Sequence, residues 1–331
     1  MSLPALAELR RRFPDARIAI LARPWVADLY QREPFADEII LYPKAAGFRQ
    51  SWQLRSQVAG KIRKAGFDTA LLLQNAFDAA LLAWKARIPM RIGYARDGRS
   101  ALLTHPIRVP RKGEIPPHES FYYLELLRRA GWLESYPSGP LIRLESAPLA
   151  RAAGIERLTA YGLEGPVIGV SPGAAYGNAK RWPADRFVAA AVDLANRIGG
   201  AVALFGSADE RSLCEGIQSR LEERGITAVN FAGRTSLSEF IDMAAACAVF
   251  LTNDSGAMHI ASALNVPTVA VFGATNHITT GPTGPRARVI RRDVECSPCL
   301  LRECPLDHRC MRAVDPQPVA DTAFELLQQK G

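Results

Sequence analysis

The sequence predicts an α/β protein that consists of two facing Rossmann-like domains. Two observations support this fold class: short apolar strands alternate with longer helices, and the alternation occurs in each half of the 331-residue chain. The chain is also long enough for two domains with separate cores, and 48% of its residues are hydrophobic. We expect domains over residues 1–150 and 151–331, joined near the Ser-, Gly- and Pro-rich segment 137–148.

The first half begins with a helix, since Leu3, Leu6 and Leu9 have helical spacing and Pro14 follows the last turn. The apolar run 17–22 is predicted as the first strand. Further strands are predicted over residues 36–41, 67–74 and 91–94, with helices around 25–29 and over 50–65, 76–86 and 119–130. A doubly wound domain normally opens with the strand that occupies the middle of its sheet. Because this chain opens with a helix, either the first domain is wound differently or it lacks its central first strand.

The second half repeats the alternation of strands and helices. A short strand is predicted over residues 141–144, before the repeat begins. The remaining strands are predicted over residues 167–170, 201–205, 228–231, 249–252 and 268–272, and the helices over 183–198, 210–225, 237–246 and 257–264. In such a sheet, ligands bind outside the carboxyl ends of the strands, so the segments that follow the strands are the candidates for function.

The net charge of +8 is concentrated in the first half. Residues 1–150 contain 23 Lys and Arg against 14 Asp and Glu, whereas the remaining residues contain 18 against 19. The excess is either a solubilising surface or the contact for a partner with negative groups, such as phosphates, an anionic membrane or nucleic acid. No helix-turn-helix, zinc-finger or RNA-binding pattern accompanies it, so nucleic acid is disfavoured. Without a run of 18 apolar residues or a signal-peptide pattern, we expect a cytoplasmic protein.

The segment SPGAAYGNAKRWP, residues 171–183, joins a predicted strand to a predicted helix. Its glycines, including Gly173 directly after Ser171 and a proline, allow the backbone to approach a ligand closely, and Lys180 supplies positive charge. These features predict a phosphate-binding loop. The segment is neither a P-loop nor a G-x-G-x-x-G motif, and an ordinary loop with exposed basic residues is the alternative.

The segment TNDSGAMH follows another predicted strand and contains good helix-capping residues. Backbone N–H groups at Ser255 and Gly256 would then begin a helix and bind a diphosphate, while Asp254 would accept hydrogen bonds from a hydroxyl group or order the loop. His259 would lie on the first turn, where a lone histidine is more often structural than catalytic.

Two acidic residues, Asp209 and Glu210, follow a third predicted strand. An acidic side chain at this position is well placed to bind the hydroxyl groups of a ribose. The alternative is that these carboxylates stabilise the start of the next helix.

Four cysteines lie close together near the end of the chain, at Cys296, Cys299, Cys304 and Cys310. Their spacing allows four thiolates around a zinc ion, but it lacks the two separated pairs of the common zinc modules. Disulfides are disfavoured in a cytoplasmic protein. Reduced structural thiols are therefore the favoured interpretation, and a metal site is the alternative.

In combination, the segments SPGAAYGNAKRWP, FGSADE, TNDSGAMH and CSPCLLRECPLDHRCM resemble the lipopolysaccharide heptosyltransferases of glycosyltransferase family nine, in particular the heptosyltransferase II branch. The resemblance covers nearly the whole chain, because LPALAELRRRFPDARI is also similar to the family's first helix and second strand. It implies a GT-B fold, with an N-terminal acceptor-binding domain, a C-terminal nucleotide-sugar-binding domain and the active site in the cleft between them.

The resemblance further implies an inverting, metal-independent transfer of heptose from ADP-heptose to the inner core of lipopolysaccharide, with no cofactor. It implies that Lys180 contacts the donor phosphates, that Asp254 to His259 border the donor, and that the Asp209–Glu210 loop reaches the ribose. The implied partners are ADP-heptose, a phosphorylated lipid-linked acceptor and, transiently, the anionic inner face of the cytoplasmic membrane. Nucleic acid is not among them.

The chain departs from the family pattern at its start. Family members usually begin with an apolar strand and a Gly-Asp turn, and that Asp is the expected catalytic base. Because Met1 coincides with an internal position of the pattern, we expect the base to lie upstream of Met1 and the chain as written to have little transferase activity. The alternatives are a relative with another donor or acceptor, a nucleotide-sugar epimerase, and a truncated, non-catalytic nucleotide-binding protein.

Overall fold

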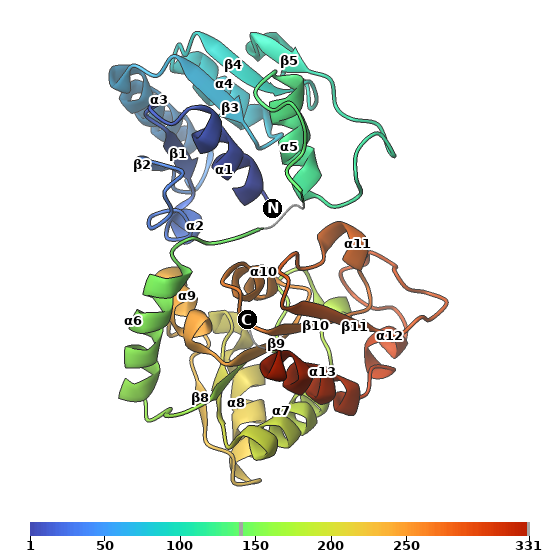
Figure 1. Cartoon of the computed structure of the whole chain (residues 1–331). Helices are drawn as coiled ribbons and strands as arrows, with labels where there is room; N and C mark the ends of the chain where they lie inside the picture. Colours follow the sequence, from blue (N-terminus) through green and yellow to red (C-terminus); the bar gives the residue numbers. More distant parts are fainter. Residues whose placement is uncertain (139–141, 330–331) are drawn as a thin grey trace. The chain divides into compact units, whose positions relative to one another are not determined.

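The computed structural model describes residues 1–138 and 142–329, which form two compact units, Met1–Pro140 and Leu141–Gly331 (Figure 1). Each unit combines parallel strands with helices, as the sequence predicts. The division falls before the expected boundary at residue 150, because helix α6 (Ala147–Ala160) packs on helix α9 (Leu237–Ala246) of the second unit. No helix within the described ranges has both the length and the apolar character needed to cross a membrane.

The first unit contains two separate parallel sheets. One pairs β1 with β2, and the other has the order β3-β4-β5. The strands are β1 (Ala19–Ala22), β2 (Glu38–Leu41), β3 (Thr69–Leu72), β4 (Met90–Tyr94) and β5 (His105–Ile107). The helices are α1 (Leu3–Arg12), α2 (Pro24–Ala27), α3 (Phe48–Ala65), α4 (Phe77–Lys85) and α5 (Ser120–Arg129).

The second unit contains one parallel sheet of six strands, in the order β11-β10-β9-β6-β7-β8. These strands are β6 (Val167–Ser171), β7 (Ala201–Leu204), β8 (Ala228–Asn230), β9 (Val249–Asn253), β10 (Thr268–Phe272) and β11 (Ala287–Arg291). Besides α6 and α9, the helices are α7 (Ala184–Ile198), α8 (Arg211–Glu222), α10 (Gly256–Ala263), α11 (His277–Thr280), α12 (Arg309–Arg312) and α13 (Pro316–Gln328). Every residue of β6, β9 and β10 is buried, which is typical of strands covered by helices on both faces.

The two units differ at the middle of their sheets. In the second unit, β6 is the first strand of the sheet in chain order and lies between β7 and β9. In the first unit, neither β1 nor β3 pairs with a further strand among the described residues, so no described strand takes the position of β6. This confirms the predicted lack of a central first strand. As a consequence, most residues of β1 and β3 are only partly buried, unlike those of β6.

Several elements differ from the sequence-based expectation. The prediction of a strand over residues 141–144 is wrong for residues 142–144, which form no strand, and residue 141 lies outside the described ranges. The backbone N–H of Ile142 donates to the Thr283 hydroxyl at 2.9 Å and that of Leu144 donates to the Ala263 carbonyl at 3.0 Å, so no strand ladder forms. Helices α6 and α13 and strands β5 and β11 were not expected.

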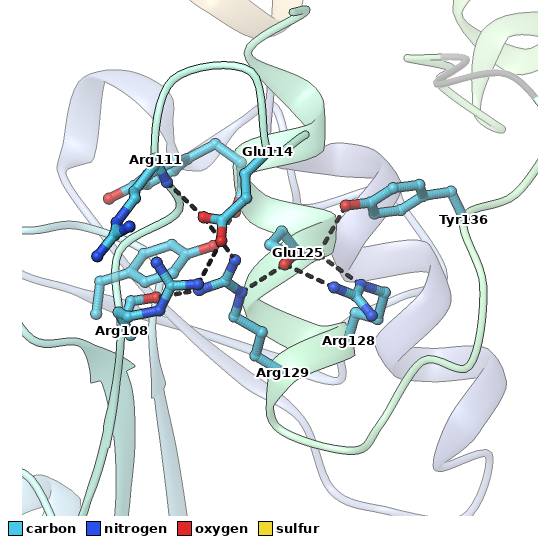
Figure 2. Close-up of polar contacts among 9 residues, drawn as sticks. Arg108, Arg111, Glu114, Glu125, Arg128, Arg129 and Tyr136 are labelled. Atoms are coloured by element: carbon cyan, nitrogen blue, oxygen red, sulfur yellow. Dashed lines mark hydrogen bonds and ion pairs between the residues drawn. The ribbon is translucent and has the colours of Figure 1, made fainter. Parts of the chain in front are cut away.

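A buried carboxylate on helix α5 gathers several polar side chains of the first unit (Figure 2). The Glu125 side chain on α5 has no exposed surface, and it accepts hydrogen bonds from Arg128 at 2.6 Å, from Arg129, and from the Tyr136 hydroxyl at 2.6 Å. Arg129 also pairs with Glu114, which accepts from Arg108 as well. We call these six residues the Glu125 cluster. It fixes the basic loop that follows β5 against helix α5.

Candidate functional site

The candidate site lies at the carboxyl edge of the sheet in the second unit. The loop 172–183 follows β6, the residues Asp254 and Ser255 follow β9, and the loop 273–276 follows β10. From β6 the chain adds β7 and β8 on one side of the sheet, and then β9, β10 and β11 on the other side. The strand order therefore reverses between β6 and β9. Open α/β sheets bind their ligands at such a reversal.

A buried asparagine holds the loop 172–183 in place. Asn253, the last residue of β9, donates its side-chain amide to the carbonyl of Pro172 at 2.7 Å and to that of Gly173 at 3.3 Å. Its side-chain oxygen accepts from the backbone N–H of Trp182 at 3.0 Å. One fully buried side chain therefore ties both ends of the loop to the centre of the sheet. This role of Asn253 was not predicted, although a polar residue that ends an apolar strand is a usable signal.

Trp182 anchors the far end of the same loop. Its side chain is buried, its indole N–H donates to the carbonyl of Val314 at 3.0 Å, and its ring packs edge-on against Phe187 at 4.8 Å. Because both the apolar body and the polar N–H of the indole are satisfied, the anchor fixes the position of Lys180, two residues earlier.

Lys180 and Asp254 form an ion pair at the carboxyl edge of the sheet. The Lys180 ammonium lies 2.7 Å from a carboxylate oxygen of Asp254, and the same oxygen accepts a hydrogen bond from the Thr275 hydroxyl at 2.7 Å. The exposed fractions of the two side chains are 14% and 7%, so water screens the pair only weakly. The ammonium also lies 4.9 Å from the ring centroid of Tyr176. Loops from β6, β9 and β10 thus hold one cation in a defined position.

Helix α10 begins beside this ion pair. Ser255 caps the helix, because its hydroxyl accepts from the backbone N–H of Met258 at 3.5 Å and lies 3.2 Å from the Thr252 hydroxyl. Gly256, the first helical residue, is exposed, and His259 is half-buried on the first turn. The start of a helix carries a partial positive charge and free N–H groups, so it adds to the attraction of an anion by Lys180.

The two acidic residues after β7 differ in their roles. Glu210 is buried and forms a capping box with Ser207, whose backbone N–H donates to its carboxylate at 2.8 Å. The same carboxylate lies against Gly173, where an added Cβ would come within 1.9 Å of it. Asp209 is exposed. Glu210 therefore stabilises the helix start, as the alternative interpretation held, and only Asp209 has a carboxylate exposed to solvent.

The cysteine-containing segment supports the loop 172–183 from outside. The carbonyl of Arg302 accepts from the backbone N–H of Ala179 at 3.1 Å, and the Arg302 side chain donates to the carbonyl of Tyr176 at 2.8 Å. The backbone N–H of Cys304 donates to the side chain of Asn178 at 3.2 Å. This contact could not be predicted from the sequence, because the two segments lie more than a hundred residues apart.

None of the cysteines takes part in a disulfide, and Cys310 is buried while Cys296, Cys299 and Cys304 are half-buried. Within the part of the chain that the structure describes, no three His, Cys, Asp or Glu side chains are grouped so that they could hold a metal ion.

Replacing Gly177 by alanine is expected to destabilise the second unit by about 1–3 kcal/mol, since overpacking of a tight contact costs this much. A Cβ at this position would lie 2.0 Å from the carbonyl oxygen of Arg302, and backbone cannot move aside as a side chain can. Thermal unfolding measures the effect. The matched control is Gly216→Ala on α8, where an added Cβ meets nothing within 4 Å and alanine favours the helix. Equal melting temperatures for the two variants would contradict the close contact.

Comparisons with known proteins agree on one family. The family profile described as glycosyltransferase family 9 (heptosyltransferase) matches residues 55–309. The chain is 33% identical over 309 residues to lipooligosaccharide heptosyltransferase 2 of Haemophilus influenzae, covering 88% of this chain and 84% of that protein. It is 31% identical over 338 residues to lipopolysaccharide heptosyltransferase 2 of Salmonella typhimurium, covering 100% of this chain and 95% of that protein.

Two solved structures extend the comparison to the fold. The structure of the ADP-heptose LPS heptosyltransferase II of Escherichia coli matches with a TM-score of 0.82 at 31% identity, covering 99% of this chain and 94% of that chain. A family 9 glycosyltransferase of Veillonella parvula matches with a TM-score of 0.83 at 25% identity, covering 99% and 93%. The two α/β units are thus similar to those of solved proteins over almost their whole length.

Proposed function

The chain belongs to glycosyltransferase family 9 and has its GT-B fold, and from this premise we propose that it transfers a heptose from ADP-heptose to a sugar hydroxyl in the inner core of lipopolysaccharide. The observation that carries the proposal is the ion pair of Lys180 and Asp254 beside the start of α10. It places a fixed cation and free backbone N–H groups where a nucleotide diphosphate binds in an α/β sheet. We infer heptose as the transferred sugar and lipopolysaccharide as the acceptor from the relatives, which are named as lipopolysaccharide or lipooligosaccharide heptosyltransferases.

In the proposed complex, the donor binds to the second unit. The diphosphate lies against Lys180 and the helix start at Ser255 and Gly256. Ser171 and Gly173 are buried, and the Glu210 carboxylate fills the space beside Gly173, so these two residues support the loop from below. Asp254 keeps the lysine in position, and His259 borders the donor from the next turn. We assign the contact with the ribose to Asp209, because the carboxylate of Glu210 is already held by the capping box.

The proposed reaction inverts the configuration at the anomeric carbon of the heptose. The acceptor hydroxyl oxygen forms a bond to that carbon while the bond from the carbon to the diphosphate oxygen of ADP breaks. A base takes the hydroxyl proton, and negative charge grows on the leaving ADP. Lys180 and the start of α10 stabilise this charge, so we propose a transfer that needs neither a metal nor a cofactor.

The first unit is proposed to bind the acceptor. The positive excess of the chain lies within residues 1–150, and the inner core of a lipid-linked acceptor carries phosphates. An acceptor with a lipid anchor also requires the enzyme to work at a membrane surface. We therefore propose that the protein is cytoplasmic and peripheral to the inner face of the cytoplasmic membrane.

Calorimetric titration with ADP-heptose and with UDP-sugars tests the donor assignment. We expect ADP-heptose to bind more tightly than any UDP-sugar, and preference for a uridine donor would reject the proposal. Incubation of the protein with ADP-heptose alone and with ADP-heptose plus core acceptor tests the reaction class. Conversion of the nucleotide sugar without the acceptor would instead indicate an epimerase.

A further inference from the structure

We propose that the outer surface of helices α3 and α4 docks the first unit onto an anionic lipid bilayer. We call it the α3–α4 surface and define it by its exposed or half-exposed cations and aromatic rings: Arg49, Trp52, Lys61, Arg63, Lys64, Phe77, Trp84 and Lys85. The inference extends the proposed membrane association to particular residues. It rests on none of the residues of the donor site.

Helix α3 presents a cationic face to solvent. Its buried side is apolar and consists of Val58, Ala59 and Ile62. The exposed side carries four cations, and the helix contains no Asp or Glu. These cations are Arg49, Lys61, Arg63 and Lys64. A cationic face without carboxylates, opposite an apolar face that is already buried in the core, is suited to a negatively charged plane rather than to the protein interior.

Among the described residues, no ion pair neutralises the four exposed cations of this face. The carboxylate of Asp78 on α4 lies close to α3, but it pairs with Arg55 at 2.6 Å and accepts from the Tyr42 hydroxyl at 2.8 Å. Arg55 and Tyr42 are both half-buried, so Asp78 neutralises the charge of Arg55 where the two helices meet. The four exposed cations of α3 therefore keep their charge available for a partner.

Exposed aromatic rings adjoin the cations. The exposed fractions of Trp52 and Trp84 are 49% and 51%, and that of Phe77 is 47%. Phe77 and Trp84 are seven residues apart, so they lie on one face of α4. The Lys85 ammonium lies 3.2 Å from the ring centroid of Trp52, and Arg63 donates to the carbonyl of Lys85. The two helices pack together in the first unit, and the contact between Lys85 and Trp52 joins their exposed residues.

This combination favours a bilayer over the other anionic partners. Tryptophan rings partition into the interface between lipid headgroups and acyl chains, and basic residues are attracted to anionic headgroups. An acidic protein or a nucleic acid would satisfy the cations, but the apolar edges of Phe77 and Trp84 gain most from a hydrocarbon boundary. The proposed acceptor is itself held in a membrane, so docking here would keep the first unit next to it.

Sedimentation with phospholipid vesicles tests the α3–α4 surface without donor or acceptor. We expect the protein to bind phosphatidylcholine vesicles that contain about 30% phosphatidylglycerol, and to bind pure phosphatidylcholine or high-salt samples weakly. Lys61→Gln/Lys64→Gln should lower the partition coefficient about tenfold, and Trp84→Ser about fivefold. The matched control is Arg220→Gln/Arg224→Gln, which removes two exposed cations of the second unit and should leave binding unchanged.

Three results would overturn this inference: equal partitioning of the two double variants, equal binding to neutral and anionic vesicles, or tight binding of single-stranded RNA without vesicle binding. Urea unfolding of Lys61→Gln/Lys64→Gln, followed by tryptophan fluorescence, should match that of the wild type, which shows that the first unit of the variant is folded. If the wild type binds vesicles but does not bind ADP-heptose, the proposed function is rejected while the inference about the α3–α4 surface still holds.

Discussion

Replacing Lys180 by methionine is expected to lower kcat/KM for heptose transfer by about 10²–10³-fold. Removal of one preorganised group that stabilises developing charge costs this much in other enzymes, and the Lys180 ammonium is held at 2.7 Å from Asp254 before any ligand arrives. Methionine keeps much of the length and apolar character of the lysine stem. Steady-state kinetics with ADP-heptose and core acceptor measure the effect, at enzyme concentrations high enough to quantify the low activity expected of the wild-type chain. A loss confined to KM would instead mean that Lys180 stabilises the bound ground state and the transition state equally.

The same substitution removes the ion-pair partner of Asp254, so stability must be separated from chemistry. A buried carboxylate left without its cation costs about 1–3 kcal/mol, even though Thr275 still donates to it. The double variant Lys180→Met/Asp254→Asn removes both charges, so it should recover stability without recovering activity. Arg220→Met on the exposed side of α8 is the matched control and should keep both. Recovery of activity in the double variant would contradict a direct role for the lysine.

The sequence predicted the candidate site because its elements are local. A strand that runs into glycines and a lysine, and a strand that runs into helix-capping residues, identify loops at the carboxyl edge of a sheet. Lys180 and Asp254 are 74 residues apart, and their pairing follows from the adjacency of β6 and β9. The predicted capping alternative for Glu210 followed from the acidic residues at the start of a helix.

Contacts between distant segments could not be predicted from the sequence. Asn253 ties both ends of the loop 172–183, and nothing in the pattern of β9 says which backbone groups its amide reaches. The support from Arg302 depends on how the segment after β11 returns to the sheet. Helix α6 was missed for a related reason: its apolar face is defined by packing on α9, where Gly154 approaches the backbone of Asp242 closely.

For the charge excess of the first half, the sequence likewise shows only how many charged residues there are, and not which of them are exposed or paired. In the structure, the basic residues of this half are of two kinds. Some are exposed cations, as on α3, and others are paired with a carboxylate, as in the Glu125 cluster. Only the first kind is available to a phosphorylated acceptor or a membrane. The second kind contributes to the stability of the first unit, and its contribution can be measured separately.

Replacing Glu125 by glutamine is expected to destabilise the first unit by about 3 kcal/mol. Breaking a buried ion pair by removing one partner costs about 3–5 kcal/mol, and the low end applies because Arg128 is partly exposed. Urea unfolding followed by tryptophan fluorescence measures the effect, since four of the five tryptophans belong to the first unit. Glu134→Gln, an exposed position of the same unit, is the control and should change stability by less than about 0.5 kcal/mol.

The Glu125 cluster also predicts how stability depends on pH. Burial alone would raise the pKa of Glu125, but hydrogen bonds from Arg128, Tyr136 and Arg129 outweigh it and lower the pKa from 4.5 to about 2. The hydrogen bond from Arg108 likewise lowers the pKa of Glu114 to about 2. Carboxylates with a lowered folded-state pKa stabilise the folded state above about pH 4.5, and this contribution disappears as the pH falls toward 2. Unfolding midpoints of the wild type should therefore fall more steeply between pH 5 and pH 2 than those of Glu125→Gln, and parallel curves would show that Glu125 titrates normally.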